Sequence, residues 1–451
     1  MTTGSPLRII LLFSIPVLLG NLFQQFYNMV DTIIVGRYLG EEALAAVGST
    51  GSLNFLIIGF VLGMCSGFCI PVAQGFGVMV SHAFGAKDFK LLRHYVALSL
   101  ILTLIISLLL TIPTVTASRL LLAWMHTPEN IIAMADAYIK VIFAGILLTM
   151  AYNVLSGILR GIGDSRTPLY FLILSSVLNI ILDVVLIVYT GLGTAGAAYA
   201  TIIAQGVSAV LCFFYMYRKY DILRTRHEDY YLDSAGVKNM LAIGVPMALN
   251  YSITAIGTMI MQSAVNVFGS SVVAAFTAAS KVSNIATQSM PTLGTAMATY
   301  CGQNLGAGKY DRIYAGMRQG LFLCFGAAAT AAAICIFGGR FIVSWFVSNP
   351  SEEIFSSAMQ YLTIASWFFL PLAMIFLYRN ALQGLDQGLI PMLSGVVELA
   401  CRFGVIALIP ASTGFFGVCF ADPAAWAGAG IPLFITYLLW EHRMKQCSMA
   451  V

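Results

Sequence analysis

The sequence contains little charge. Only 9% of its 451 residues are Asp, Glu, Lys or Arg, while 59% are hydrophobic. Soluble domains carry about 25% charged residues, so this chain has too few charges to cover a water-exposed surface. Its mean hydropathy of +0.88 is that of an integral membrane protein, and a soluble globular fold is excluded.

Residue patterns that would indicate an enzyme, a metal site or an ATP-driven pump are also missing. The nine cysteines form no paired CxxC motifs with metal-site spacing. The five histidines lie in predicted loops or near helix ends, which argues against a buried histidine proton relay. The nearest match to a phosphate-binding loop, Gly306 to Tyr310, lacks the upstream glycine and the Ser or Thr of a Walker sequence. We therefore expect no enzyme, no cofactor and no direct use of ATP.

Long apolar runs recur along the whole chain. A helix needs roughly 20 residues to cross the hydrocarbon core of a bilayer, and Tyr95 to Val115 contains no charge at all. The first run is too long for the apolar core of a signal peptide, so we expect it to remain as a span. The twelve predicted spans are 8–37, 43–76, 92–118, 130–157, 168–190, 194–217, 237–267, 271–300, 314–338, 355–382, 389–411 and 424–441.

The distribution of Lys and Arg predicts the orientation. With the N-terminus inside, 16 of the 23 basic residues lie on the inner side, in loops or at the inner ends of spans, against only Arg37, Arg119 and Arg340 on the outer side. An even number of spans places both termini on one side. We therefore expect a multi-pass plasma-membrane protein with both termini in the cytoplasm. The net charge of +4 reflects this bias, and we expect no nucleic-acid partner.

The two halves of the sequence resemble each other. The matches, in chain order, are Ile15-Pro16 with Val245-Pro246, Gly40 with Gly269, the loops at 84–88 and 305–311, and Leu159-Arg160-Gly161 with Leu382-Gln383-Gly384. Repeats of six spans insert with the same orientation and are related by an axis along the membrane normal, a design common in secondary transporters. We predict an N-terminal six-helix bundle at 1–218, a cytoplasmic linker at 219–236 and a C-terminal six-helix bundle at 237–451. A channel or a receptor has no need of this duplication.

Two aspartates lie deep inside predicted spans. An ionised carboxylate at a helix centre costs about 2.5 to 3.5 kcal/mol on insertion scales, so Asp31 and Asp183 need a reason to be there. Asn179 lies one turn before Asp183 on the same helix face, and Thr201 in the next span offers a hydroxyl. Two carboxylates in a dry site can share a proton or chelate a cation. These four residues are therefore a candidate site for H⁺ or Na⁺, and the alternative is that each aspartate only hydrogen-bonds a neighbouring helix.

The first span carries further polar residues and an internal proline. Gln24, Tyr27 and Asp31 form a polar stripe on the first span. Pro16 in the same span removes a backbone hydrogen bond and favours a kink, which is either a moving hinge or a static bend.

A charged cluster is also expected in the C-terminal half. Glu398 and Arg402 are four residues apart in the eleventh span, and Arg379 in the tenth span is placed to approach them. They form either a structural ion pair or a group that handles substrate or protons.

Several of these motifs, in this order, resemble the multidrug and toxin extrusion (MATE) family over essentially the whole chain. The motifs are Gln24 to Thr32, Leu159 to Asp164 followed by Thr167-Pro168, and Asn179 to Asp183 followed by Gly196 to Thr201. The resemblance implies an all-α membrane fold of twelve helices in two six-helix bundles. It also implies a monomer that exports amphipathic, often cationic compounds in exchange for H⁺ or Na⁺.

Within the family the chain resembles the DinF-like branch. This resemblance implies that Asp31, Asn179, Asp183 and Thr201 form the cation site and that the first span bends at Pro16. It also implies that Gln24, Tyr27 and Asn153 line the substrate cavity, whereas it offers no role for Glu398 and Arg402. The alternative function is a flippase for lipid-linked saccharides of the same superfamily, although such proteins usually need more basic residues in the membrane than this chain has.

Overall fold

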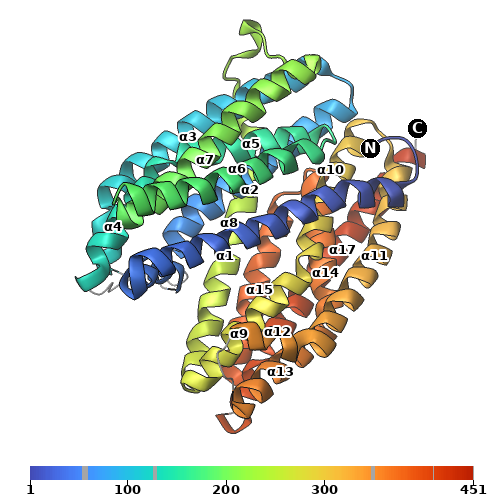
Figure 1. The fold of residues 1–451 in the computed structure, drawn as a ribbon. Coiled ribbons are helices and arrows are strands. Elements are labelled where there is room, and N and C mark those ends of the chain that lie inside the picture. The colour runs from blue at the N-terminus through green and yellow to red at the C-terminus, as the bar shows by residue number, and fades with distance from the viewer. Residues whose placement is uncertain (53–58, 125–128, 347–350, 410, 450–451) are drawn as a thin grey trace. The chain divides into compact units, whose positions relative to one another are not determined.

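The computed structural model describes the whole chain except residues 53–58, 125–128, 347–350, 410 and 450–451 (Figure 1). The described residues are helical almost throughout, which confirms the predicted all-α membrane fold. The helices are α1 Pro6–Ser52, α2 Gly59–Gly85, α3 Phe89–Trp124, α4 Glu129–Ala144, α5 Ile146–Gly161, α6 Arg166–Val184, α7 Gly193–Lys219, α8 Ser234–Asn266, α9 Ser270–Thr287, α10 Ser289–Gly306, α11 Tyr310–Ala333, α12 Gly339–Phe346, α13 Glu352–Trp367, α14 Phe369–Gly384, α15 Leu389–Leu408, α16 Gly414–Val418 and α17 Ala421–Met449.

Most of the predicted spans correspond to helices of the structure. Among the described residues, eight helices are long and apolar enough to cross a membrane. The number rises to ten if α4 with α5, bent by 46°, and α13 with α14, bent by 53°, each form one span. The predicted span 271–300 is divided between α9 and α10, and 43–76 falls partly on residues 53–58, outside the described part.

The described residues divide into two compact units. One, here called the N-terminal unit, contains residues 15–252, and the other, the C-terminal unit, contains residues 1–14 and 253–451. Both borders fall inside helices with an internal proline, namely α1 with Pro16 and α8 with Pro246. The structure therefore places the segment 219–236 in the N-terminal unit, and the division into two six-helix bundles stays a prediction.

Specific contacts explain why the 219–236 segment belongs to the N-terminal unit. Arg93 of α3 donates to the carboxylate of Asp229 at 3.3 Å. The two ring nitrogens of His94 lie 3.1 Å from the backbone oxygen of Asp229 and 2.6 Å from Oδ1 of Asp233. The Gly236 amide and His94 both lower the pKa of Asp233. The contacts of Arg93 and His94 with Asp229 and Asp233 therefore tie this segment to α3.

Glycines of the internal repeat allow close contacts between helix backbones in each unit. A Cβ added to Gly161 of α5 would lie 2.6 Å from the backbone oxygen of Gly77 in α2. A Cβ added to Gly384 of α14 would come still closer to the backbone oxygen of Ala298 in α10. Figure 1 shows α10, α11, α14 and α17 side by side in the C-terminal unit. The matching motifs Leu159-Arg160-Gly161 and Leu382-Gln383-Gly384 therefore each place a glycine against the backbone of a neighbouring helix, once in each unit.

We expect Gly384→Ala to destabilise the protein by about 1 to 3 kcal/mol, the usual cost of overpacking. The added methyl group would meet backbone atoms, which cannot rotate away. Gly404→Ala in α15 is the matched control, since no atom lies within 4 Å of its added Cβ. That change should be neutral or stabilising by up to about 1 kcal/mol. Thermal unfolding in detergent measures both, and equal effects would contradict the packing argument.

Candidate cation site

The helix that carries two of the predicted site residues, α6, begins at a well-defined turn. Asp164 accepts hydrogen bonds from the backbone amides of Arg166 and Thr167 at 3.1 and 3.0 Å. The hydroxyl of Tyr220, just after α7, donates to the same carboxylate at 2.6 Å. Burial opposes the charge of Asp164, but the hydrogen bonds from Thr167 and Tyr220 outweigh it and hold the pKa of Asp164 below its usual value. This cap fixes where α6 starts and ties it to the end of α7.

The structure brings the four predicted cation-site residues together within the N-terminal unit. Asp31 lies on α1, Asn179 and Asp183 on α6, and Thr201 on α7. The carboxyl groups of Asp31 and Asp183 are within hydrogen-bonding reach of each other. The Asn179 side chain donates to the hydroxyl of Thr201 at 3.4 Å. Asp183 and Asn179 are buried, with 0% and 2% of their surface exposed, and Asp31 is half-buried.

Several oxygens of this site have no hydrogen-bond donor. They are Oδ1 of Asp31, Oδ1 of Asn179 and both carboxylate oxygens of Asp183, all of which are buried. A buried polar atom without a partner costs about 1 to 3 kcal/mol, and more if it is charged. A proton shared by the two carboxyl groups, or a cation bound by these oxygens, would remove this cost. The residues present therefore fit either H⁺ or Na⁺.

The predicted cavity residues are linked by polar contacts that run through Gln205 and Thr149. The hydroxyl of Tyr27 is in hydrogen-bond contact with Gln24 and Gln205. Gln205 Oε1 accepts from the hydroxyl of Thr149 at 2.5 Å, and the side chain of Asn153 donates to the backbone oxygen of Thr149 at 2.8 Å. Sequence reasoning missed Gln205 and Thr149. Their signal was helical spacing, since Gln205 follows Thr201 by one turn and Thr149 precedes Asn153 by one turn.

Pro16 is buried inside α1, which is helical through this position. The border between the units falls after Ser14, two residues earlier. The chain therefore passes from one unit to the other next to a residue that cannot donate a backbone hydrogen bond. The role of Pro16 as a hinge stays a prediction.

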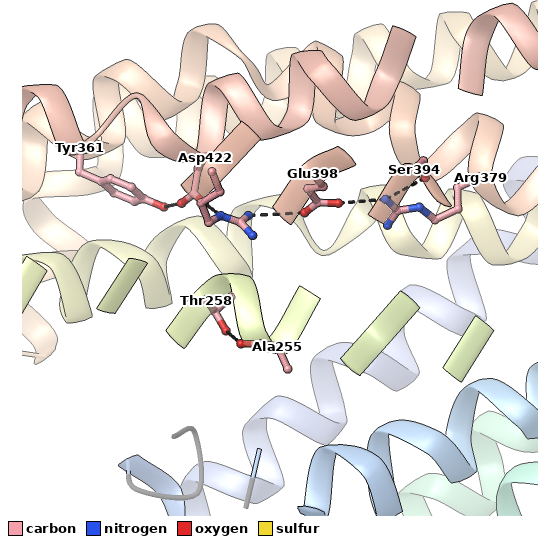
Figure 2. Close-up of polar contacts among 8 residues, drawn as sticks. Ala255, Thr258, Tyr361, Arg379, Ser394, Glu398 and Asp422 are labelled. Atoms are coloured by element: carbon pink, nitrogen blue, oxygen red, sulfur yellow. Dashed lines mark hydrogen bonds and ion pairs between the residues drawn. The ribbon is translucent and has the colours of Figure 1, made fainter. Parts of the chain in front are cut away.

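The charged residues predicted in the C-terminal half form a larger cluster than expected (Figure 2). Arg379 donates to Glu398 at 2.9 Å, and Arg402 lies 3.4 Å from Glu398 and 2.9 Å from Asp422. The hydroxyl of Tyr361 donates to Asp422 at 2.9 Å. The C-terminal charged cluster, defined as Arg379, Glu398, Arg402 and Asp422, thus contains two positive and two negative groups.

The predicted contact among Arg379, Glu398 and Arg402 is present, but neither Asp422 nor its hydrogen-bond partner Tyr361 was predicted from the sequence. Asp422 precedes the predicted twelfth span, which was placed at 424–441, whereas α17 begins at Ala421. Tyr361 has no charged neighbour at helical spacing that would have singled it out. Both contacts depend on how α13, α15 and α17 pack, which spacing along one helix does not reveal.

Comparison with known proteins places these observations in a family. Residues 16–185 and 246–408 match the MatE family. Over 422 residues the chain is 28% identical to a probable multidrug resistance protein, YpnP, of Bacillus subtilis, covering 92% of this chain and 91% of that one. It is 30% identical over 366 residues to the probable multidrug resistance protein YoeA of the same organism, covering 80% and 77% of the two chains.

Solved structures share the fold. The structure of a MATE protein in complex with MaL6 superimposes with a TM-score of 0.89 at 23% sequence identity, covering 98% of both chains. At that identity the likeness concerns the arrangement of helices alone.

Proposed function

Because this chain belongs to the MatE family, whose members are membrane transporters and not enzymes, we propose that it is an ion-coupled antiporter. It exports amphipathic, often cationic, small molecules from the cytoplasm in exchange for H⁺ or Na⁺. The observation that carries this proposal is the pair of Asp31 and Asp183, in which Oδ1 of Asp31 and both carboxylate oxygens of Asp183 are buried without a donor. Export itself is supported by the relatives named as multidrug resistance proteins.

The ionisation state of the aspartate pair would be the coupling variable. When the pair is empty, two negative charges lie close together in a poorly solvated site, which is unfavourable. A proton or Na⁺ arriving from outside neutralises the pair and allows the helices that carry the aspartates to pack differently. Because Asp31 and Pro16 lie on the same helix, we infer that α1 bends near Pro16, the cavity beside Gln24, Tyr27 and Asn153 shrinks, and the substrate leaves.

The proposal also includes the location, topology and oligomeric state of the protein. It is a multi-pass plasma-membrane protein, with both termini in the cytoplasm, that works as a monomer and meets its substrates from the cytoplasm or the bilayer. We place it in the DinF-like branch of the family, because its candidate site lies on α1, α6 and α7 of the N-terminal unit.

The test uses the purified full-length chain in liposomes that contain a fluorescent lipophilic cation. A pH gradient and a Na⁺ gradient are imposed in separate experiments. In each, efflux of the fluorescent cation is compared with efflux from liposomes that contain the cation but no protein. We expect one of the two gradients to drive efflux, and that gradient identifies the coupling ion. Movement that is independent of both gradients would contradict the proposal and make lipid-linked saccharides the next substrates to test.

A further inference from the structure

The internal repeat is visible in the structure as a constant shift in residue number. Adding 223 to the first and last residue numbers of α4 gives those of α13, and the same addition converts the bounds of α5 into those of α14. The first residues of α6 and α15 also differ by 223. Applied to the candidate cation site, this shift pairs Asn179 of α6 with Arg402 of α15. A neutral amide in one unit therefore corresponds to a guanidinium in the other.

A second pair of site residues corresponds in the same way. The run from Gly196 to Thr201, GAAYAT, matches the run from Gly417 to Asp422, GVCFAD, in which glycine, an aromatic residue and alanine recur at equal spacing. Thr201 thus pairs with Asp422. In the N-terminal unit the Asn179 side chain contacts Thr201 at 3.4 Å, and in the C-terminal unit Arg402 contacts Asp422 at 2.9 Å. The repeat conserves the contact and changes its chemistry.

The neighbouring positions show what else has changed. Tyr138, within electrostatic range of Asp31 and Asp183, pairs with Tyr361, which donates to Asp422. Asp183 itself pairs with Ile406.

The counterpart of Asp31 is also apolar. Asp31 follows Pro16 by fifteen residues, and the residue at that distance from Pro246 is Met261. The C-terminal unit therefore lacks both aspartates of the pair, and the acids of its charged cluster, Glu398 and Asp422, stand at other positions of the repeat.

Arg402 lies between these two acids as a bound cation would. Its Nε contacts Asp422 on α17, and its Nη2 contacts Glu398 on α15. Only 4% of its side-chain surface is exposed. A Cβ at Gly257 of α8 would collide with Nη1, so the absence of a side chain at Gly257 makes room for the guanidinium. With Arg379 paired to Glu398, the four charges balance.

We propose that the C-terminal charged cluster is a second copy of the cation site in which Arg402 permanently occupies the place of the ion. The exchange of Asn179 for Arg402 between the repeats confines reversible ion binding to the N-terminal unit. This inference rests on the proposed function in one respect, because it treats ion binding in the N-terminal unit as the step that is coupled to transport. Removal of the Arg402 charge leaves Arg379, Glu398 and Asp422 with a net charge of −1, which one monovalent cation or one proton would neutralise.

The test measures the melting temperature of the full-length chain in detergent with Asp31→Asn and Asp183→Asn already present, so that the N-terminal site does not respond. NaCl is exchanged for choline chloride at constant ionic strength, and the pH is varied separately. In this background we expect no response to Na⁺, and its change with pH is the baseline that is subtracted from that of the variants. Adding Arg402→Asn, the residue found at the matching repeat position, should lower the melting temperature. Saturating Na⁺ or a lower pH should then raise it by about 5 °C, as expected for a ligand that binds only the folded state.

Two variants serve as matched controls. Arg402→Lys keeps the charge and should not respond to the cation. Arg402→Asn combined with Asp422→Asn removes the same guanidinium without leaving surplus charge and should not respond either. If Arg402→Asn does not fold, Arg379→Gln, which also leaves a net charge of −1, should show the cation dependence.

Two results would overturn the proposal. One is a folded Arg402→Asn variant whose melting temperature is unaffected by Na⁺ and by pH. The other is an equal response from the double control. Since the readout is stability, both results are distinguishable from a failure of transport, which the liposome experiment reports separately.

Discussion

Asp31→Asn is expected to abolish gradient-driven export while leaving the protein folded in the membrane. Asparagine has nearly the same shape as aspartate but cannot ionise, so the pair with Asp183 loses the charge change that ion binding would produce. A typical coupling free energy between two sites corresponds to a factor of about 5 to 150 in affinity, and without it the initial rate of efflux should fall to the rate seen in the absence of a gradient. Liposome efflux under the gradient that drives the wild type measures it.

The matched control for Asp31→Asn is Asp136→Asn in the same unit. Asp136 contacts Lys140 and Ser118, both at 2.6 Å, so its carboxylate already has partners and no coupling role is expected for it. Asp183→Asn should behave as Asp31→Asn does, because each removes one member of the pair. Undiminished coupled export by Asp31→Asn would refute the assignment of this pair as the coupling site.

The candidate site was predictable from the sequence where its signals lie along a single helix. Asn179 and Asp183 are one turn apart, and an aspartate within an apolar run is conspicuous because its insertion is costly. Gln205 and Thr149 were missed, because a single amide or hydroxyl in an apolar helix is inexpensive and common. Their importance arises from contacts between α5, α7 and α1, and such contacts depend on packing that hydropathy does not encode.

The fold was predictable to the level of apolar segments but not to the level of their breaks. The segments predicted at 130–157 and 355–382 each correspond to two helices, and the first pair meets at Gly145 with a bend of 46°. Hydropathy stays high across both breaks, so no drop in the apolar pattern marks them. The first span was predicted to end at residue 37, yet α1 continues to Ser52, because hydropathy locates apolar stretches and not the ends of helices.

The second large effect is expected at Glu398, which holds the C-terminal charged cluster together. Glu398→Gln would leave Arg379 and Arg402 facing a neutral amide, with Asp422 as the one remaining acid of the cluster. Removing one partner of a buried ion pair typically costs about 3 to 5 kcal/mol, because an uncompensated charge remains buried. We expect a loss of this size in the free energy of unfolding, measured in detergent at neutral pH.

Two further variants separate the stability of the cluster from a role in transport. Glu352→Gln is the exposed control. It removes an acid beside Arg340 of which 80% of the side-chain surface is exposed, and it should lower the free energy of unfolding by about 0.5 kcal/mol or less.

Glu398→Gln combined with Arg379→Gln restores charge balance and should recover much of the lost stability. If this double variant is stable and still exports under the gradient, the cluster is a structural ion-pair network. If it is stable but inactive, Glu398 or Arg379 takes part in handling substrate or protons. A Glu398→Gln variant as stable as Glu352→Gln would show that the cluster contributes little to folding.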